Sequence, residues 1–154
     1  MKVNVGLLFI LFPLLISCEQ DVPNRQAPAN PTLVGSGLEV QDAWARPAAE
    51  GLPSAVYFTL VNYDEVSATI TGVASSRAQL AEIHESYERE PGLMGMRKIE
   101  ELTIPGQSTL PFERGGLHVM LLNVQPELAE GDAFTLSLHL AGRDTLRIPV
   151  QVRR

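Results

Sequence analysis

Hydrophobic and polar residues alternate over most of the chain after residue 37. In residues 133–140 (AFTLSLHL) every second residue is apolar, which places one hydrophobic and one polar face on an extended segment. Gly, Pro, Asn and Asp separate such segments at intervals of 8 to 14 residues. The predicted strands are Leu38–Ala45, Ala55–Val61, Ala68–Val73, Leu80–Tyr87, Met94–Leu102, Thr109–Phe112, Leu117–Val124, Ala133–Leu140 and Thr145–Val152.

Helical periodicity is almost absent from the same part of the chain. Ser75–Ala81 and Gln125–Ala129 are each long enough for a single turn, and Pro126 suits the first position of a helix. Nine short strands without a sustained helical stripe are typical of an antiparallel sandwich. We therefore predict an all-β fold in a single domain, residues 38–154.

The first 17 residues have the pattern of an export signal. Lys2 precedes an apolar run from Val5 to Ile16, about a dozen residues long and too short to span a bilayer reliably. The run ends at Ser17-Cys18, which resembles the lipobox of bacterial lipoproteins, in which the chain is cut before a cysteine that then carries the lipid. An ordinary cleaved signal with an accidental cysteine is the alternative. We expect residues 1–17 to be a lipoprotein signal peptide and Cys18 to be the lipidation site, so that the protein is exported to the periplasm or another extracytoplasmic face and held on the membrane by the lipid alone.

Charge and cysteine content narrow the function of the exported part. Residues 18–37 are rich in Pro, Asn and Gln, and we expect them to be a flexible tether. Removal of the signal takes away one lysine and no acid, so the formal net charge changes from −6 to −7. Such an acidic protein is a poor candidate for binding nucleic acid. Because Cys18 is the only cysteine, the domain has no thiolate for zinc, for a blue-copper site or for nucleophilic catalysis.

Candidate metal ligands occur on three predicted strands. In His118-Val119-Met120 the imidazole and the thioether share one face, which should be wet or covered by a loop. His84 precedes a turn at Pro91-Gly92, and Met94 and Met96 follow it, so a hairpin would bring them together. Neutral imidazole and thioether donors suit Cu(I), whereas zinc rarely uses methionine.

Other interpretations of these residues remain open. Methionine is a common filler of protein cores, and His118 would also be acceptable as an ordinary surface histidine. We expect His139 to be a solvated residue on a polar face and Trp44 to serve packing. No nucleophile elbow, helical His pair or phosphate-binding loop is present, so we predict that the protein is not an enzyme.

Residues 38–152 also carry a resemblance to a known family. The segment GGLHVML (115–121) resembles the signature strand of periplasmic copper chaperones of the PCu(A)C type, and residues 42–46 (DAWAR) and 55–58 (AVYF) are similar to that family too. The family's metal motif is His, ten residues, Met, twenty-one residues, His, one residue, Met. Twenty-one residues separate Met96 from His118, as in the motif, but eleven separate His84 from Met96.

The resemblance implies a cupredoxin-like β-sandwich that binds Cu(I) through His84, Met96, His118 and Met120. Met94 is a possible substitute for Met96, since nine residues separate it from His84. It further implies a carrier that gives copper to a recipient such as the copper centre of cytochrome c oxidase or another copper chaperone. The alternatives are a binding protein for copper scavenging or resistance, and a structural sandwich whose His and Met residues are incidental.

Overall fold

The computed structural model describes residues 32–34 and 37–154, and this part of the chain contains eleven strands and no helix. The described residues accordingly offer no helix with the length and hydropathy needed to span a membrane. The signal segment and Cys18 lie outside the described residues. The strands are β1 (Thr32–Val34), β2 (Leu38–Ala45), β3 (Ser54–Asn62), β4 (Ala68–Ser75), β5 (Ala78–Glu90), β6 (Leu93–Ile99), β7 (Leu102–Ile104), β8 (Ser108–Phe112), β9 (Leu117–Val124), β10 (Ala133–Leu140) and β11 (Leu146–Val152).

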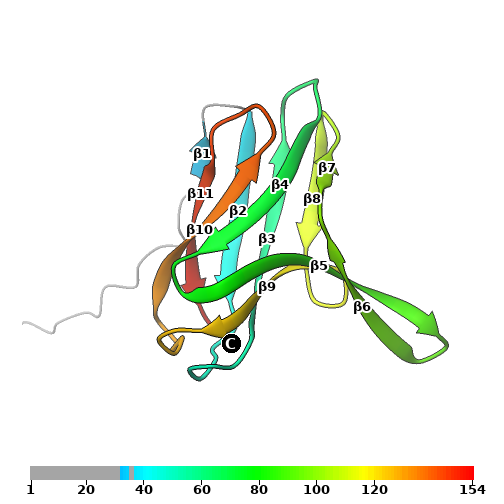
Figure 1. The fold of residues 1–154 in the computed structure, drawn as a ribbon. Coiled ribbons are helices and arrows are strands. Elements are labelled where there is room, and N and C mark those ends of the chain that lie inside the picture. The colour runs from blue at the N-terminus through cyan, green and yellow to red at the C-terminus, as the bar shows by residue number, and fades with distance from the viewer. Residues whose placement is uncertain (1–31, 35–36) are drawn as a thin grey trace, which may run out of the picture.

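The strands form one hydrogen-bonded path that folds over into two layers (Figure 1). Its order is β6-β5-β9-β3-β2-β11-β10-β4-β7, with β1 added to β2 and β8 added to β3. All strand pairs are antiparallel except β2 with β11. The predicted all-β sandwich is confirmed.

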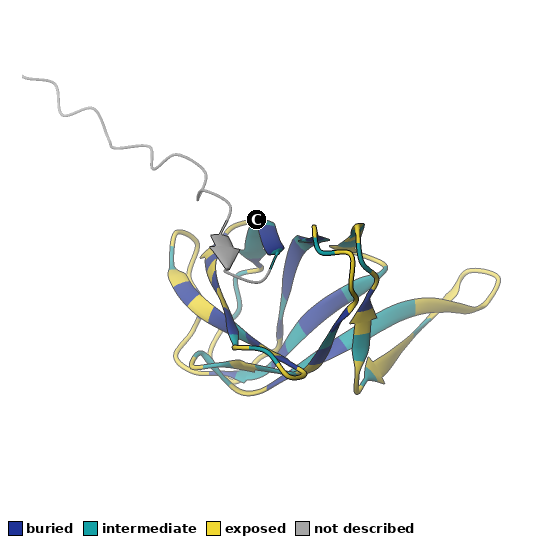
Figure 2. Ribbon diagram, turned by 90° about the horizontal axis from the view of Figure 1, so that it is seen from above, coloured by how far each residue is buried: buried dark blue, intermediate teal, exposed yellow. Residues whose placement is uncertain are grey.

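Alternation along the strands builds the core between the layers. The inward residues of β3, β9, β10 and β11 are apolar and buried, and Figure 2 shows them as dark bands that alternate with exposed ones. Each buried Val, Leu or Ile side chain stabilises the fold by roughly 1.5–3 kcal/mol. Fully buried members of this core include Val56, Leu60, Ile70, Ile104, Val119, Leu121, Leu136, Leu138, Leu146 and Ile148.

Two predicted segments differ from the structure. The strand expected over Met94–Leu102 is divided at Glu100-Glu101 into β6 and β7, which lie at opposite ends of the strand order. The inward apolar positions change parity between Ile99 and Leu102, as they must when the chain passes from one layer to the other. The three residues of β1 fall within the expected tether.

The predicted helical turns are also wrong. Ser75 ends β4 and a short turn leads directly into β5, so no helical turn forms there. No helical turn forms at residues 125–129 either: residues 125–126 form a bend, and Leu128 exchanges both backbone hydrogen bonds with Ala48, at 3.0 and 2.8 Å. Backbone pairing with a neighbouring segment thus overrides the local preference.

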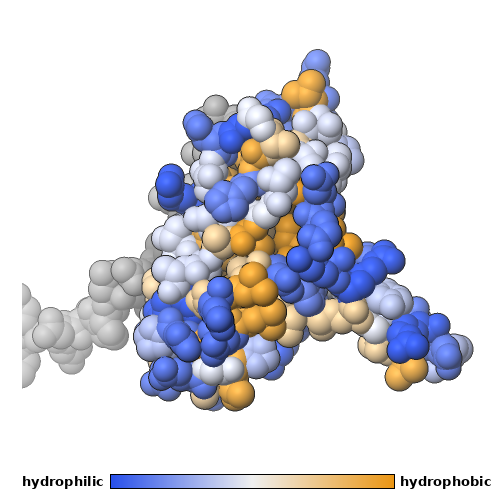
Figure 3. Space-filling model, viewed as in Figure 1, coloured by the Kyte–Doolittle hydropathy of each residue, from blue (hydrophilic) through white to orange (hydrophobic). Residues whose placement is uncertain are grey.

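The β5–β6 hairpin extends away from the body of the sandwich (Figure 1). It is longer than predicted, since β5 continues to Glu90. Its surface is mostly hydrophilic, with hydrophobic residues at its end (Figure 3), where Leu93 and Met94 are 48% and 56% exposed. Because β6 is the last strand of the path, it is hydrogen-bonded on one side only.

Candidate metal centre

A bulge in β2 sets the position of the aromatic residue nearest to the candidate site. Gln41 pairs with Thr59 and Trp44 with Tyr57, so β2 carries one extra residue between these pairs. Asp42 has a φ of 54°, a conformation that Asp tolerates better than most residues. The extra residue reverses the alternation: Ala45 enters the core, and Trp44 lies on the outer face of the sheet.

On this outer face four rings follow one another across neighbouring strands. Trp44 of β2 packs on Tyr57 of β3, with ring centroids 4.8 Å apart. Tyr57 lies 6.3 Å from His118 of β9, and His118 lies 6.0 Å from His84 of β5. His84 and His118 are direct cross-strand partners, so the two imidazoles that the sequence singled out are neighbours.

His118 is more enclosed than expected. It is only 5% exposed, and its surroundings are loop and aromatic side chains rather than water. Its Nδ1 lies 3.1 Å from the backbone oxygen of Gly116. When Nδ1–H donates a hydrogen bond to this carbonyl, the lone pair is on Nε2, and Nε2 is the nitrogen available to a metal.

In His84 the two ring nitrogens have the opposite roles. Its Nε2 lies 3.0 Å from Oε2 of Glu82, two residues earlier on the same strand face, and its Nδ1 is buried without a hydrogen-bond partner among the described residues. When Nε2–H donates a hydrogen bond to the Glu82 carboxylate, Nδ1 carries the lone pair. A buried acceptor without a partner is costly in an ordinary protein interior, and a metal ion would satisfy it.

Glu82 is itself held in place from the other side. Nζ of Lys98, the cross-strand partner of His84, lies 3.2 Å from Oε1 of Glu82 and 3.1 Å from Glu100. The hydrogen bond from His84, and then that from Lys98, lower the pKa of Glu82 below its ordinary value, while partial burial opposes them. The pKa of Lys98 is raised, chiefly by its hydrogen bonds to Glu100 and Glu82. The carboxylate therefore stays ionised as a support for the imidazole.

The two candidate thioether ligands, Met96 and Met120, lie on strands next to His84 and His118. Met120 is two residues after His118 on the same face of β9, and Met96 of β6 pairs with Ser86, two residues after His84. Met96, His118 and Met120 line one pocket of about 590 Å³. His84 does not line this pocket, but its ring lies next to that of His118.

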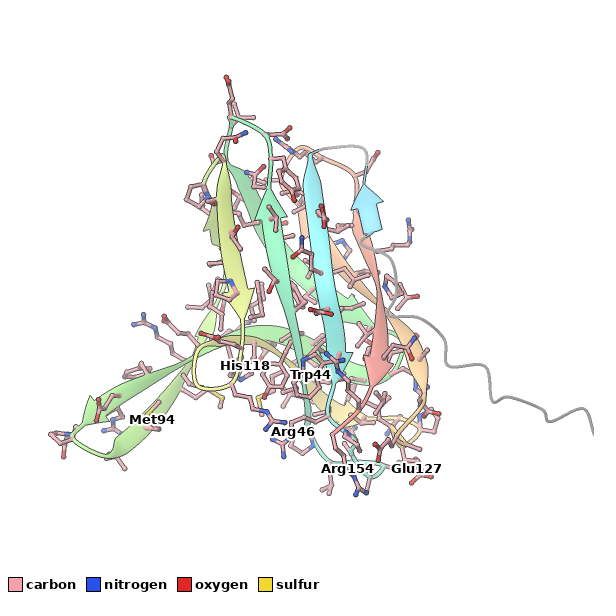
Figure 4. The ribbon with its side chains drawn as sticks, turned by 180° about the vertical axis from the view of Figure 1, so that it is seen from behind. Trp44, Arg46, Met94, His118, Glu127 and Arg154 are labelled. Carbon is pink, nitrogen blue, oxygen red and sulfur yellow. The ribbon has the colours of Figure 1, made fainter. Side chains whose placement is uncertain are left out.

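Met94 lies elsewhere. It pairs with Glu88 near the end of the hairpin and does not line the pocket. Figure 4 shows it at the far end of the hairpin, well away from His118. The pairing irregularity of the hairpin lies between Glu88 and Glu90, beyond Met96, so the register from His84 to Met96 is regular.

The other residues singled out in the sequence have clear positions as well. His139 is exposed on β10 and lies 3.2 Å from the Thr145 hydroxyl, as expected for a surface residue. Within residues 37–154 no three His, Cys, Asp or Glu side chains gather into a metal-binding group, so a site here has to use thioethers. Glu82 was not predicted to have a role at the site; its i, i+2 spacing from His84 on a strand was the available signal.

Comparison with known proteins places this arrangement among relatives. The family model described as "Putative lipoprotein LpqE-like" matches residues 38–152. The "Putative lipoprotein Lxx21020" of Leifsonia xyli subsp. xyli is 26% identical over 117 residues, which are 76% of this chain and 70% of that protein.

Solved structures agree on the fold. The copper-bound PCuAC domain from PmoF2 superimposes with a TM-score of 0.64 at 19% identity, over 80% of this chain and 97% of that one. The Cu(I) form of DR1885 from Deinococcus radiodurans has a TM-score of 0.56 at 28% identity, over 74% of this chain and 78% of that one. The resemblance to PCu(A)C proteins and the cupredoxin-like sandwich are thereby confirmed.

Proposed function

Since the chain belongs to the LpqE-like family and has the fold of PCuAC domains, we propose that it is an exported, lipid-anchored carrier of one Cu(I) ion. The proposed ligands are His84 through Nδ1, His118 through Nε2, Met96 and Met120. The observation that carries this proposal is the buried Nδ1 of His84, without a hydrogen-bond partner among the described residues, beside His118, which lines one pocket together with Met96 and Met120.

The chemistry of the donor set favours monovalent copper. Two neutral imidazoles and two neutral thioethers bring no negative charge, which suits a soft monovalent ion better than a hard dication. Glu82 contributes charge only behind His84, where its hydrogen bond fixes the tautomer and the orientation of the imidazole. Without thiolates the ion is held less tightly, which favours its transfer to an acceptor.

Copper titration of matched methionine variants tests the ligand set. Met120→Leu and Met94→Leu each replace a thioether by an alkyl group of similar size. We expect the full-length protein and Met94→Leu to bind one equivalent of Cu(I) against a chromophoric competitor. Met120→Leu should lose more affinity than the roughly 10- to 100-fold that removal of a supporting hydrogen bond costs. Absence of stoichiometric binding to the unmodified protein would leave only the structural sandwich.

The destination of the copper requires a different experiment. We propose an acceptor such as the copper centre of cytochrome c oxidase or another copper chaperone, on the basis of the resemblance to PCu(A)C proteins. A strain without this gene should lose oxidase activity and regain it with the unmodified gene but not with the Met120→Leu gene. Copper sensitivity with full oxidase activity would instead favour scavenging or resistance. The lipid anchor at Cys18 is tested by mass spectrometry of the exported protein, with Cys18→Ser as the control.

A further inference from the structure

Three arginines lie near Trp44 and the pocket, and we call them the arginine rim: Arg46 and Arg114, which line the pocket, and Arg153, which lies over the Trp44 ring. The guanidinium carbon of Arg114 lies 5.2 Å from the centroid of the Trp44 ring, and that of Arg153 lies 5.4 Å from it. Arg46 and Arg114 line the same pocket as Met96, His118 and Met120. Figure 4 shows Trp44, Arg46 and His118 together at one end of the sandwich.

The arginine rim has no acidic partners among residues 37–154. Five other cations there each lie within 4.0 Å of a carboxylate: Arg77, Arg97, Lys98, Arg143 and Arg154. No such ion pair involves Arg46, Arg114 or Arg153, and Glu113, although adjacent to Arg114, makes none with it. Arg89 and Arg147 also lack an acidic partner among the described residues, but neither lines the pocket or lies over the Trp44 ring. Unpaired guanidinium groups are thus concentrated beside the copper donors.

The cluster of three positive charges in the arginine rim contrasts with the formal net charge of the whole protein, which is −6. An acidic protein repels an acidic partner over most of its surface, so a local cationic region determines which face such a partner meets. Stacking on Trp44 also restricts two of the guanidinium groups before any partner arrives, which lowers the entropic cost of forming bidentate contacts.

We propose that the arginine rim docks an acidic segment of the protein that accepts the copper. The proposal rests on the proposed function, because the docked segment would bring the acceptor's ligands to the pocket that holds Met96, His118 and Met120. Carboxylates of the acceptor would bind Arg46 and Arg114 at the pocket and Arg153 beside Trp44. A protein segment is favoured over a lipid surface because Arg46 and Arg114 line the same pocket as the proposed copper ligands. An acceptor that takes the copper must bring its own ligands into this pocket, whereas a lipid headgroup need not enter it.

The experiment uses two synthetic acceptor peptides with the same pair of cysteines, flanked by glutamates in one and by glutamines in the other. Copper stoichiometry of the full-length protein is measured first, and then the rate of Cu(I) transfer to each peptide at low and high salt. We expect the acidic peptide to be faster by about tenfold at low salt, an advantage that salt removes. The variant Arg46→Gln/Arg114→Gln should lose this advantage, whereas Arg89→Gln/Arg147→Gln, which removes the same charge elsewhere, should retain it.

The outcomes separate the docking proposal from the copper proposal. Equal transfer rates to both peptides from a copper-loaded protein, or an undiminished acidic advantage in Arg46→Gln/Arg114→Gln, would overturn docking and leave copper binding intact. If the protein binds no copper, titration of the apoprotein with the acidic peptide decides, and NMR shifts confined to residues around the rim support docking. Binding of phosphatidylglycerol vesicles that needs Arg46 and Arg114, without any preference between the peptides, would assign the rim to lipid and overturn the proposal.

Discussion

Glu82 is the residue whose replacement tests most directly how the site holds its imidazoles. Its Oε2 lies 3.0 Å from Nε2 of His84 and its Oε1 lies 3.2 Å from Nζ of Lys98, and its side chain is 17% exposed. The Glu82→Gln change keeps the volume and removes the charge. His84 then loses the anionic acceptor that fixes its tautomer and its orientation.

The size of the effect follows from what such supporting groups contribute. Loss of a hydrogen-bond partner behind a metal-binding histidine typically costs 10- to 100-fold in metal affinity, which corresponds to about 1.4–2.7 kcal/mol. The charge of Glu82 is shared with Lys98, so only part of it acts on His84. We therefore expect a loss near the lower end, about tenfold in Cu(I) affinity.

The assay is a competition titration of Cu(I) against a chromophoric chelator under reducing conditions, with urea unfolding of the apoproteins to confirm that the variant folds. Glu85→Gln is the matched control. It lies on the same strand, and its carboxylate lies 2.6 Å from Arg97 rather than beside His84. Its affinity should stay within about twofold of the unmodified protein, since exposed ion pairs contribute little.

A double-mutant cycle makes the test independent of general effects on stability. If Glu82 acts through His84, then Glu82→Gln should have no further effect on a His84→Gln background. Wild-type affinity in Glu82→Gln, or equal losses in Glu82→Gln and Glu85→Gln, would refute the supporting role of the Glu82 carboxylate.

Three further results are expected. Met96→Leu should weaken Cu(I) binding in the same titration because Met96 borders the pocket; wild-type affinity would exclude it as a ligand. Affinity should be lower at about pH 5 than at about pH 7, because protons compete with the metal for the imidazole nitrogens. The pKa of Glu82 is below its ordinary value, so that carboxylate is still ionised there, and undiminished affinity at pH 5 would contradict histidine ligation. Leu136→Ala should cost about 2–5 kcal/mol in urea unfolding because Leu136 is fully buried, whereas the exposed Leu52→Ala should stay within about 0.5 kcal/mol; equal effects would contradict the assigned core.

Alternation along the chain predicts most of the strands and the face on which His118 and Met120 lie. β9 and β10 have the predicted bounds, and the His118–Met120 face is the outer one, because a period of two leaves no other choice once Val119 and Leu121 are buried. The division between β6 and β7 interrupts the single strand predicted over residues 94–102, and the change in apolar parity between Ile99 and Leu102 is the signal that marks it.

Contacts between distant segments could not be predicted in the same way. The rings of Trp44 and Tyr57 meet only because β2 carries a bulge at Asp42. The sequence around Asp42 does not by itself indicate a bulge. The arginine rim joins residues from three separate parts of the chain, and its absence of acidic partners within residues 37–154 is a property of the folded surface. Such features depend on strand order, which hydrophobic periodicity does not specify.

The two faces of the sheet suggest how the site can both hold and release an ion. His84 and His118 lie on β5 and β9, which have hydrogen-bonded neighbours on both sides. The adjacent residues in the chain, Ile83 and Val119, are buried in the core on the opposite face of the sheet. Moving either imidazole would disturb that packing. Met96 lies on β6, the edge strand, and is 50% exposed, so its displacement disturbs no buried residue. If Cu(I) is bound by the proposed ligands, an incoming acceptor ligand would therefore replace the Met96 thioether at the smallest structural cost, while the two imidazoles would still hold the ion.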